Sequence, residues 1–153
     1  MALDEAAFLA ALLPQLQGGA RDAILPVRLP PGDDCAALDL GQGDYLLLAV
    51  DQIAAEVHFH GPLSSTPTPP ALVGRKLLAR NLSDIAAMGG TPRHALLALA
   101  VPHAWPDAWV PAFMAGLLAL AAEYQVRLIG GDYGRAQAFV ASLTITGTVP
   151  AAQ

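Results

Sequence analysis

The segment Asn81-Leu-Ser-Asp-Ile-Ala-Ala-Met-Gly-Gly90 is the most informative part of this 153-residue chain. It continues a run of apolar residues at helical spacing, and the run starts at Ala71. The paired glycines at its end, followed by Pro92, are typical of the point where a helix stops. The sequence therefore predicts a helix over residues 71–88.

One carboxylate of this helix, Asp84, shares an apolar face with Leu77 and Met88. Burying it without a partner would be costly, so we expect it to meet a metal, another cation or the amide of Asn81. An ion pair within the helix between Arg80 and Asp84 is the purely structural alternative. That order of charges, with the base preceding the acid, is the weaker one.

On both sides of this helix the pattern alternates between helix and strand. The proline-rich stretch 61–70 is expected to be a loop. The predicted helices are 4–16, 71–88 and one that starts at Pro106, and the predicted strands are 35–40, 45–50, 57–59, 94–101, 126–129 and 139–149. The core-facing residues expected in the last helix are Trp109, Phe113, Leu117, Leu120 and Tyr124. This order predicts a mixed α/β fold of the α+β class.

Three further aspartates lie where strands begin or end. Asp34 follows Asp33 in a turn that enters a strand, where a solvated turn is an equal alternative. Asp51 ends the strand 45–50, and Asp132 follows a Gly-Gly pair at the end of the strand 126–129. Strand ends commonly carry functional side chains, although each aspartate could also cap a turn. Dispersed carboxylates of this type suit magnesium, which neutralises phosphate charge.

Polar residues also alternate around Val57 and Phe59. Glu56, His58 and His60 would share one face of a short strand. That face could line a pocket or simply meet water, and surface histidines are more often hydrogen-bonded than ligands.

Composition excludes several classes of function. The net charge is −5, so nucleic acid is not an expected partner. No apolar run approaches the roughly 20 residues of a membrane span. Acidic residues near the start disfavour export, and the single Cys35 cannot form an internal disulfide, which together favour the cytoplasm. The mean hydropathy of +0.45 predicts an exposed apolar interface.

P-loop, dinucleotide-binding and zinc-ligand patterns are absent from the sequence. Six other segments occur in a characteristic order: Pro-Gly-Asp-Asp-Cys-Ala at 31–36, Ala-Val-Asp at 49–51, Val-His-Phe at 57–59, residues 81–90, Leu-Ile-Gly-Gly-Asp at 128–132 and Thr-Ile-Thr-Gly-Thr-Val-Pro at 144–150. Together they resemble thiamine-monophosphate kinase, in its amino-terminal ATP-binding domain of the aminoimidazole ribonucleotide synthetase (PurM) type.

The resemblance implies a mixed sheet flanked by helices, which joins the sheet of a second subunit to form a barrel in a homodimer. It implies Mg²⁺ and ATP as cofactors and transfer of the γ-phosphate to thiamine phosphate, without a catalytic residue of the enzyme's own. His58 matches a substrate contact, and Gly131 with Asp132 matches a nucleotide contact. The residues that match the metal ligands of the family are Asp34, Asp51, Asp84 and Asp132.

The sequence departs from this family at two motifs. Ala49 and Val50 stand where hydroxyl residues precede the metal-binding aspartate, and Tyr133-Gly134 replaces a Thr-Thr pair. We expect residues 1–153 to form a single nucleotide-binding domain, without the carboxyl-terminal domain of the family. Three interpretations follow: part of a thiamine-phosphate kinase, a noncatalytic dimerisation or regulatory domain, or a related synthetase with another phosphate acceptor.

Overall fold

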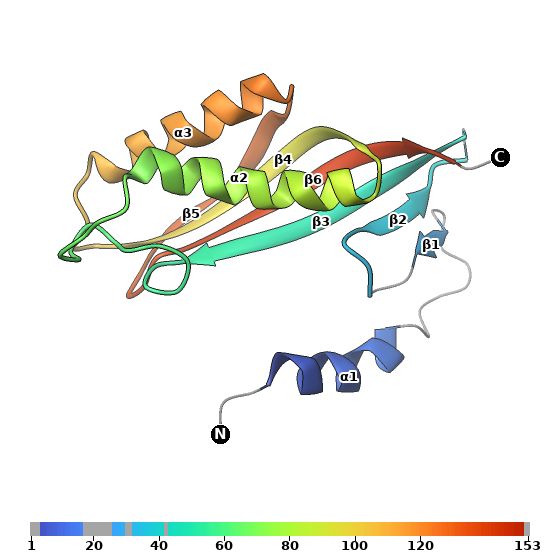
Figure 1. The fold of residues 1–153 in the computed structure, drawn as a ribbon, viewed down its shortest axis with the longest axis horizontal. Helices are drawn as coiled ribbons and strands as arrows, with labels where there is room; N and C mark the ends of the chain where they lie inside the picture. The colour runs from blue at the N-terminus through green and yellow to red at the C-terminus, as the bar shows by residue number, and fades with distance from the viewer. Residues whose placement is uncertain (1–3, 17–25, 30–31, 42, 152–153) are drawn as a thin grey trace.

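A computed structural model describes residues 4–16, 26–29, 32–41 and 43–151 (Figure 1). Its strands form one six-stranded sheet in the order β1-β2-β3-β6-β4-β5. The elements are α1 (Glu5–Leu16), β1 (Val27–Leu29), β2 (Ala36–Asp39), β3 (Asp44–Ala54), α2 (Pro70–Ala87), β4 (Thr91–Pro102), α3 (Trp109–Glu123), β5 (Arg127–Ala136) and β6 (Val140–Pro150). The mixed fold predicted from the sequence is confirmed.

The sheet is antiparallel except at one edge. β3 and β6 pair along their whole length, from Asp44 opposite Pro150 to Ala54 opposite Val140. β4 and β5 run parallel, because α3 returns the chain to the end at which β4 began. The long β3–β6 pair is the centre of the sheet.

Helices α2 and α3 lie side by side on one face of this sheet (Figure 1). Alternate strand residues point toward them, so that Leu47, Ala49 and Ile53 of β3 are buried. The two helices approach closely at Gly74 and Gly116. A Cβ at Gly116 would overlap the backbone of α2, and one at Gly74 would overlap the backbone of α3.

The opposite face of the sheet carries no helix in the part of the chain that the structure describes. Val50 is 65% exposed and Leu96 is 46% exposed there. On β6, threonines alternate with the buried residues, and the side chains on this face are half-buried. Helix α1 lies apart from the sheet, with Phe8 and Leu16 exposed (Figure 1). We call the surface of β3, β6 and β4 that points away from α2 and α3 the open face.

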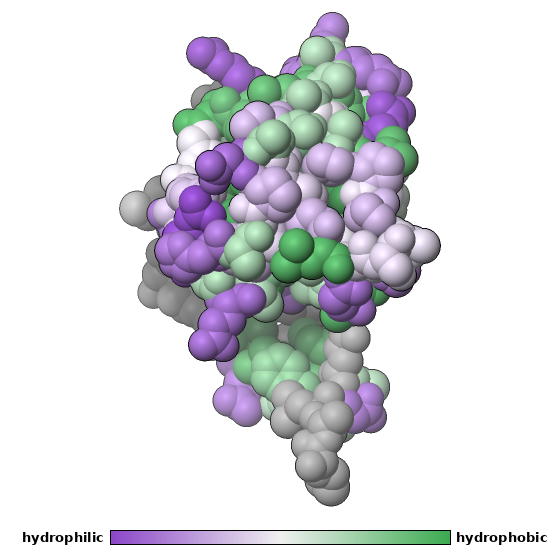
Figure 2. All heavy atoms as spheres, turned by 90° about the vertical axis from the view of Figure 1, so that its left-hand side faces the viewer, coloured by the Kyte–Doolittle hydropathy of each residue, from purple (hydrophilic) through white to green (hydrophobic). Residues whose placement is uncertain are grey.

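Figure 2 shows the end of the molecule at which the loop 61–69 lies. Polar and apolar residues are interspersed there, and the apolar ones form separate patches. Among the described residues, no helix is both long and apolar enough to cross a membrane.

Several details of the sequence-based elements were wrong. Residues 57–59 belong to a turn rather than a strand. Tyr124 is half-exposed beyond the end of α3, whereas the other four residues expected to face the core are buried. β1 was not predicted, and α3 begins at Trp109 rather than Pro106. Gly18 and Gly19, which follow the predicted helix 4–16 in the sequence and are expected to end it, lie outside the described residues.

Candidate functional site

Three of the four predicted aspartates lie near one another beside α2. Asp51 lies two residues from each of the buried Ala49 and Ile53 on β3, so it shares their face and points to the helix side of the sheet. Asp84 lies on the last turns of α2, and Asp34 directly precedes the buried Cys35, which comes just before β2. Asp51 and Asp34 both act electrostatically on Asp84, so the charges of the three carboxylates influence one another beside α2. We call Asp34, Asp51 and Asp84 the acidic cluster.

The electrostatics of the acidic cluster favour a bound cation. The pKa of Asp84 is raised, first by its partial burial and then by the negative charges of Asp51 and Asp34. The pKa of the Cys35 thiol is raised to about 11, mainly by burial and next by Asp84 and Asp34. Negative charge is therefore disfavoured at this place until a positive charge offsets it.

Arg80 supplies part of the positive charge that offsets the acidic cluster. Its Nε donates to Asp51 Oδ2 at 3.1 Å, and its Nη2 donates to Asp51 Oδ1 at 2.9 Å. The ion pair considered from the sequence, between Arg80 and Asp84, is not among the salt bridges of the described residues. The Asn81 amide donates to the Leu77 carbonyl instead of to Asp84.

Asp132 lies away from the acidic cluster. It is in the middle of β5 rather than at a strand end, because β5 continues to Ala136. Three strand spacings separate β5 from β3, which is about 14 Å at the usual interstrand distance. Asp132 is level with Ala98, which is exposed between buried neighbours on β4. The pairing thus puts Asp132 on the side of the sheet away from α2.

Asp51 also lies within its strand and not at the end. β3 continues for three residues beyond it, to Ala54, because β6 pairs with it over this length. Asp51 therefore lies on the helix side because side chains alternate between the two faces of β3, and not because the strand ends there.

The donor set of the acidic cluster fits a magnesium ion in its chemistry. Carboxylate oxygens are the hard ligands that magnesium prefers, and each member of the acidic cluster supplies them. Within the described ranges, no three His, Cys, Asp or Glu side chains converge closely enough to hold a metal. Both oxygens of Asp51 are bound to Arg80, so a metal would have to displace this contact.

His58 lies in the turn that follows β3. Its Nδ1 accepts a hydrogen bond from the Ala54 amide at 3.0 Å, so a neutral ring carries its proton on Nε2. Its carbonyl accepts a hydrogen bond from Lys76 Nζ at 2.6 Å, which ties the turn to α2. Glu56, two residues before His58, has a positive φ of 61°. This uncommon backbone conformation often occurs at binding sites.

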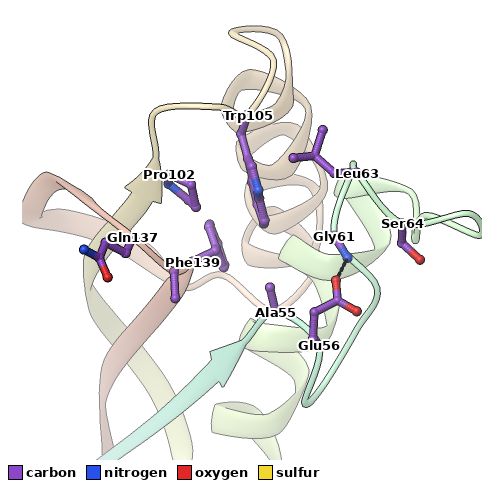
Figure 3. Close-up of a pocket in the computed structure, with 10 residues that line it drawn as sticks. Ala55, Glu56, Gly61, Leu63, Ser64, Pro102, Trp105, Gln137 and Phe139 are labelled. Carbon is purple, nitrogen blue, oxygen red and sulfur yellow. Dashed lines mark hydrogen bonds between the residues drawn. The ribbon is translucent and has the colours of Figure 1, made fainter.

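A cavity of about 400 Å³ opens beside this turn (Figure 3). Its wall is aromatic: the rings of Trp105 and Phe139 are stacked, with centroids 4.8 Å apart. Glu56 accepts a hydrogen bond from the Gly61 amide at 2.8 Å at the rim of the cavity. The pKa of Glu56 is lowered by this bond and by His60.

Sequence reasoning missed Arg80 as the partner of Asp51 and Trp105 as a cavity wall. A signal for Arg80 was available, because a cation on a helix that packs on the strand of Asp51 is a natural counter-ion. No local pattern distinguishes Trp105 from an ordinary core tryptophan.

The fold and the acidic cluster together define a class of protein. It is a mixed α/β domain that carries a group of carboxylates beside a helix that packs on its sheet. Residues 32–149 match the family model of AIR synthase related protein, N-terminal domain. The chain belongs to this family.

Curated relatives are thiamine-monophosphate kinases, as the sequence resemblance predicted. The Bacillus subtilis kinase is 39% identical over 123 residues, which cover 80% of this chain and 37% of the relative. The Escherichia coli K12 kinase is 38% identical over 130 residues, covering 85% and 38%. The chain thus spans less than two fifths of the length of these relatives.

Solved structures agree with this family. A ThiL structure complexed with AMPPCP and TMP superposes with a TM-score of 0.82 at 25% identity, covering 98% of this chain and 44% of that one. The thiamine-monophosphate kinase of Stenotrophomonas maltophilia K279a gives 0.64 at 35% identity, covering 98% and 44%. Escherichia coli HypE, at 16% identity and a TM-score of 0.58, shares the fold.

Proposed function

We propose that this chain is the magnesium–ATP-binding part of a thiamine-monophosphate kinase. The enzyme would transfer the γ-phosphate of ATP to thiamine phosphate, which yields thiamine diphosphate and ADP. The observation that carries the proposal is the acidic cluster between α2 and the sheet, in a chain whose relatives are kinases of this type. A cytoplasmic location accords with the use of ATP.

The proposed roles follow from the positions of the side chains. Asp34, Asp51 and Asp84 would draw closer together to hold the magnesium ion, which neutralises phosphate charge when it is bound. Asp132, with the adjacent Gly131, would contact the nucleotide at a separate point, because β6 and β4 lie between it and Asp51. The Nε2–H group of His58 would donate a hydrogen bond to the phosphate of the acceptor.

The reaction needs positioning more than acid–base chemistry. An oxygen of the acceptor phosphate forms the new bond to the γ-phosphorus while the bond to the β–γ bridging oxygen breaks and ADP leaves. The residues of this chain bind and orient the two phosphates for this displacement, and no covalent enzyme intermediate is required. The remaining groups of the active site are proposed to lie in the part of the kinases that this chain does not match.

Isothermal titration with the nonhydrolysable analogue AMPPCP, with and without magnesium, tests the proposal. We expect binding that depends on magnesium, because phosphates and the acidic cluster repel each other unless a cation lies between them. EGTA is a suitable negative control, because it chelates calcium in preference to magnesium. Adding it to the magnesium buffer should leave nucleotide binding unchanged.

Absence of binding under both conditions would favour the second candidate, a noncatalytic dimerisation or regulatory domain. The apolar residues Ala49 and Val50 next to Asp51 are the observation in its favour, since they offer no hydroxyl groups near a metal. Tight magnesium-dependent binding would contradict it.

We propose further that the open face joins a second copy of the chain in a homodimer. Val50 and Leu96 expose apolar area on adjacent parts of one sheet surface, which a second sheet could cover. The half-buried threonines of β6 between them would pack without a charged group to desolvate.

Val50→Glu is expected to convert the dimer to a monomer, because each subunit would bury a charge at the interface. Light scattering at micromolar concentration measures the mass. Leu118→Glu is the matched control, since Leu118 is an exposed residue of α3 on the other side of the sheet. A monomeric wild-type protein, or equal masses for the two variants, would contradict the proposed interface.

A further inference from the structure

Arg80 grips Asp51 at both carboxylate oxygens, with donor–acceptor distances of 3.1 and 2.9 Å. A two-point contact between a guanidinium and a carboxylate fixes the orientation of both groups. The Arg80 side chain is 41% exposed, whereas that of Asp51 is 22% exposed. Arg80 therefore has room to move into solvent, while Asp51 is held on a central strand.

The same guanidinium also acts on the second carboxylate of the site. Arg80 and Asp84 are four residues apart on α2, so they lie on the same side of the helix. Arg80 is thus a cation that offsets the negative charge of the acidic cluster in this structure. A divalent ion needs the same oxygen atoms of Asp51, and a guanidinium that stayed in place would repel it.

We infer that Arg80 competes with the divalent cation for Asp51, so that the metal enters together with the phosphates of a nucleotide rather than alone. This inference rests on the proposed magnesium–nucleotide site. Metal alone must displace Arg80 into water, whereas a polyphosphate gives the released guanidinium new oxygen acceptors. Metal and nucleotide then raise each other's affinity, because the release of Arg80 from Asp51 frees the carboxylate for the metal and the guanidinium for the phosphates.

Titration with Mn²⁺ tests the competition directly, since this ion takes the same oxygen ligands and free Mn²⁺ is measured by electron paramagnetic resonance. Without nucleotide, Arg80→Met is expected to bind Mn²⁺ about tenfold more tightly than wild type, the scale of one lost charge-assisted contact. AMPPCP should then increase Mn²⁺ affinity less in this variant than in wild type.

Two further variants make the result specific. Arg75→Met removes an arginine of the same helix that pairs with Glu123 on α3 at 3.5 Å, and it should leave Mn²⁺ affinity unchanged. Arg80→Lys keeps the charge but not the two-point contact, so its Mn²⁺ affinity should lie between those of wild type and Arg80→Met. If Arg80→Met does not fold, Arg80→Lys carries the test.

Equal Mn²⁺ affinities of wild type and the Arg80 variants, with nucleotide-dependent metal binding intact in wild type, would overturn the competition and leave the proposed function standing. Absence of Mn²⁺ binding in every variant, with AMPPCP present or absent, would overturn both.

Discussion

Gly116→Ala is expected to destabilise the fold by about 3 kcal/mol or more, at the upper end of the range for overpacked cores. The new Cβ would overlap the Ala71 carbonyl, which belongs to the backbone of α2 and cannot rotate away as a side chain would. The helices would have to separate, and buried side chains between them and the sheet would lose contacts. Urea denaturation followed by circular dichroism measures the loss.

Gly134→Ala is the control for this substitution. A Cβ at Gly134, on β5, would meet no atom within 4 Å. Its effect on the free energy of unfolding should stay within about 0.5 kcal/mol. If the two variants unfold at the same urea concentration, the close approach of α2 and α3 is not part of the native structure.

Asp84→Asn should weaken magnesium-dependent binding of AMPPCP by about 100-fold or more, since even changes to groups behind metal ligands weaken binding 10- to 100-fold. The ligand-free protein should not lose stability. The pKa of Asp84 is raised by burial and by its acidic neighbours, so its contribution to stability is present at low pH and is lost as pH rises through this raised pKa. At neutral pH the uncharged amide is therefore tolerated or preferred.

Asp107→Asn is the matched control, because it removes the same charge from an exposed turn before α3. It should leave nucleotide affinity unchanged. Isothermal titration and thermal unfolding of both variants separate the two effects. Unchanged affinity in Asp84→Asn would sink the proposed metal site, and a large loss of stability would mean that Asp84 is structural.

The sequence predicted α2 and the half-buried position of Asp84 well, because both depend on local helical periodicity. The sequence did not predict strand pairs and ion pairs whose partners come from distant segments. β3 runs past Asp51 since β6, far along the chain, pairs with it over its full length. The partner of Arg80 was likewise set by the packing of α2 on the sheet rather than by spacing along the helix.

The turn around His58 shows the same limit at shorter range. Alternating polar and apolar residues are typical of a strand. Here, however, the imidazole of His58 accepts a hydrogen bond from the Ala54 amide, and the chain forms a turn instead. Side-chain hydrogen bonds of this kind compete with strand pairing and leave no periodic signal. Dimerisation and the proposed roles of Asp34, Asp51, Asp84, Gly131, Asp132 and His58 stay predictions.

The pairing of β3 with β6 has a kinetic consequence. Residues 44–54 must find residues 140–150 before the centre of the sheet exists, so a loop of about 85 residues has to close first. Such distant contacts slow folding. During synthesis on the ribosome, β3 acquires its neighbour on this side only after residues 140–150 have emerged. Nucleotide affinity should therefore appear late in refolding, after most of the helical circular dichroism signal has returned.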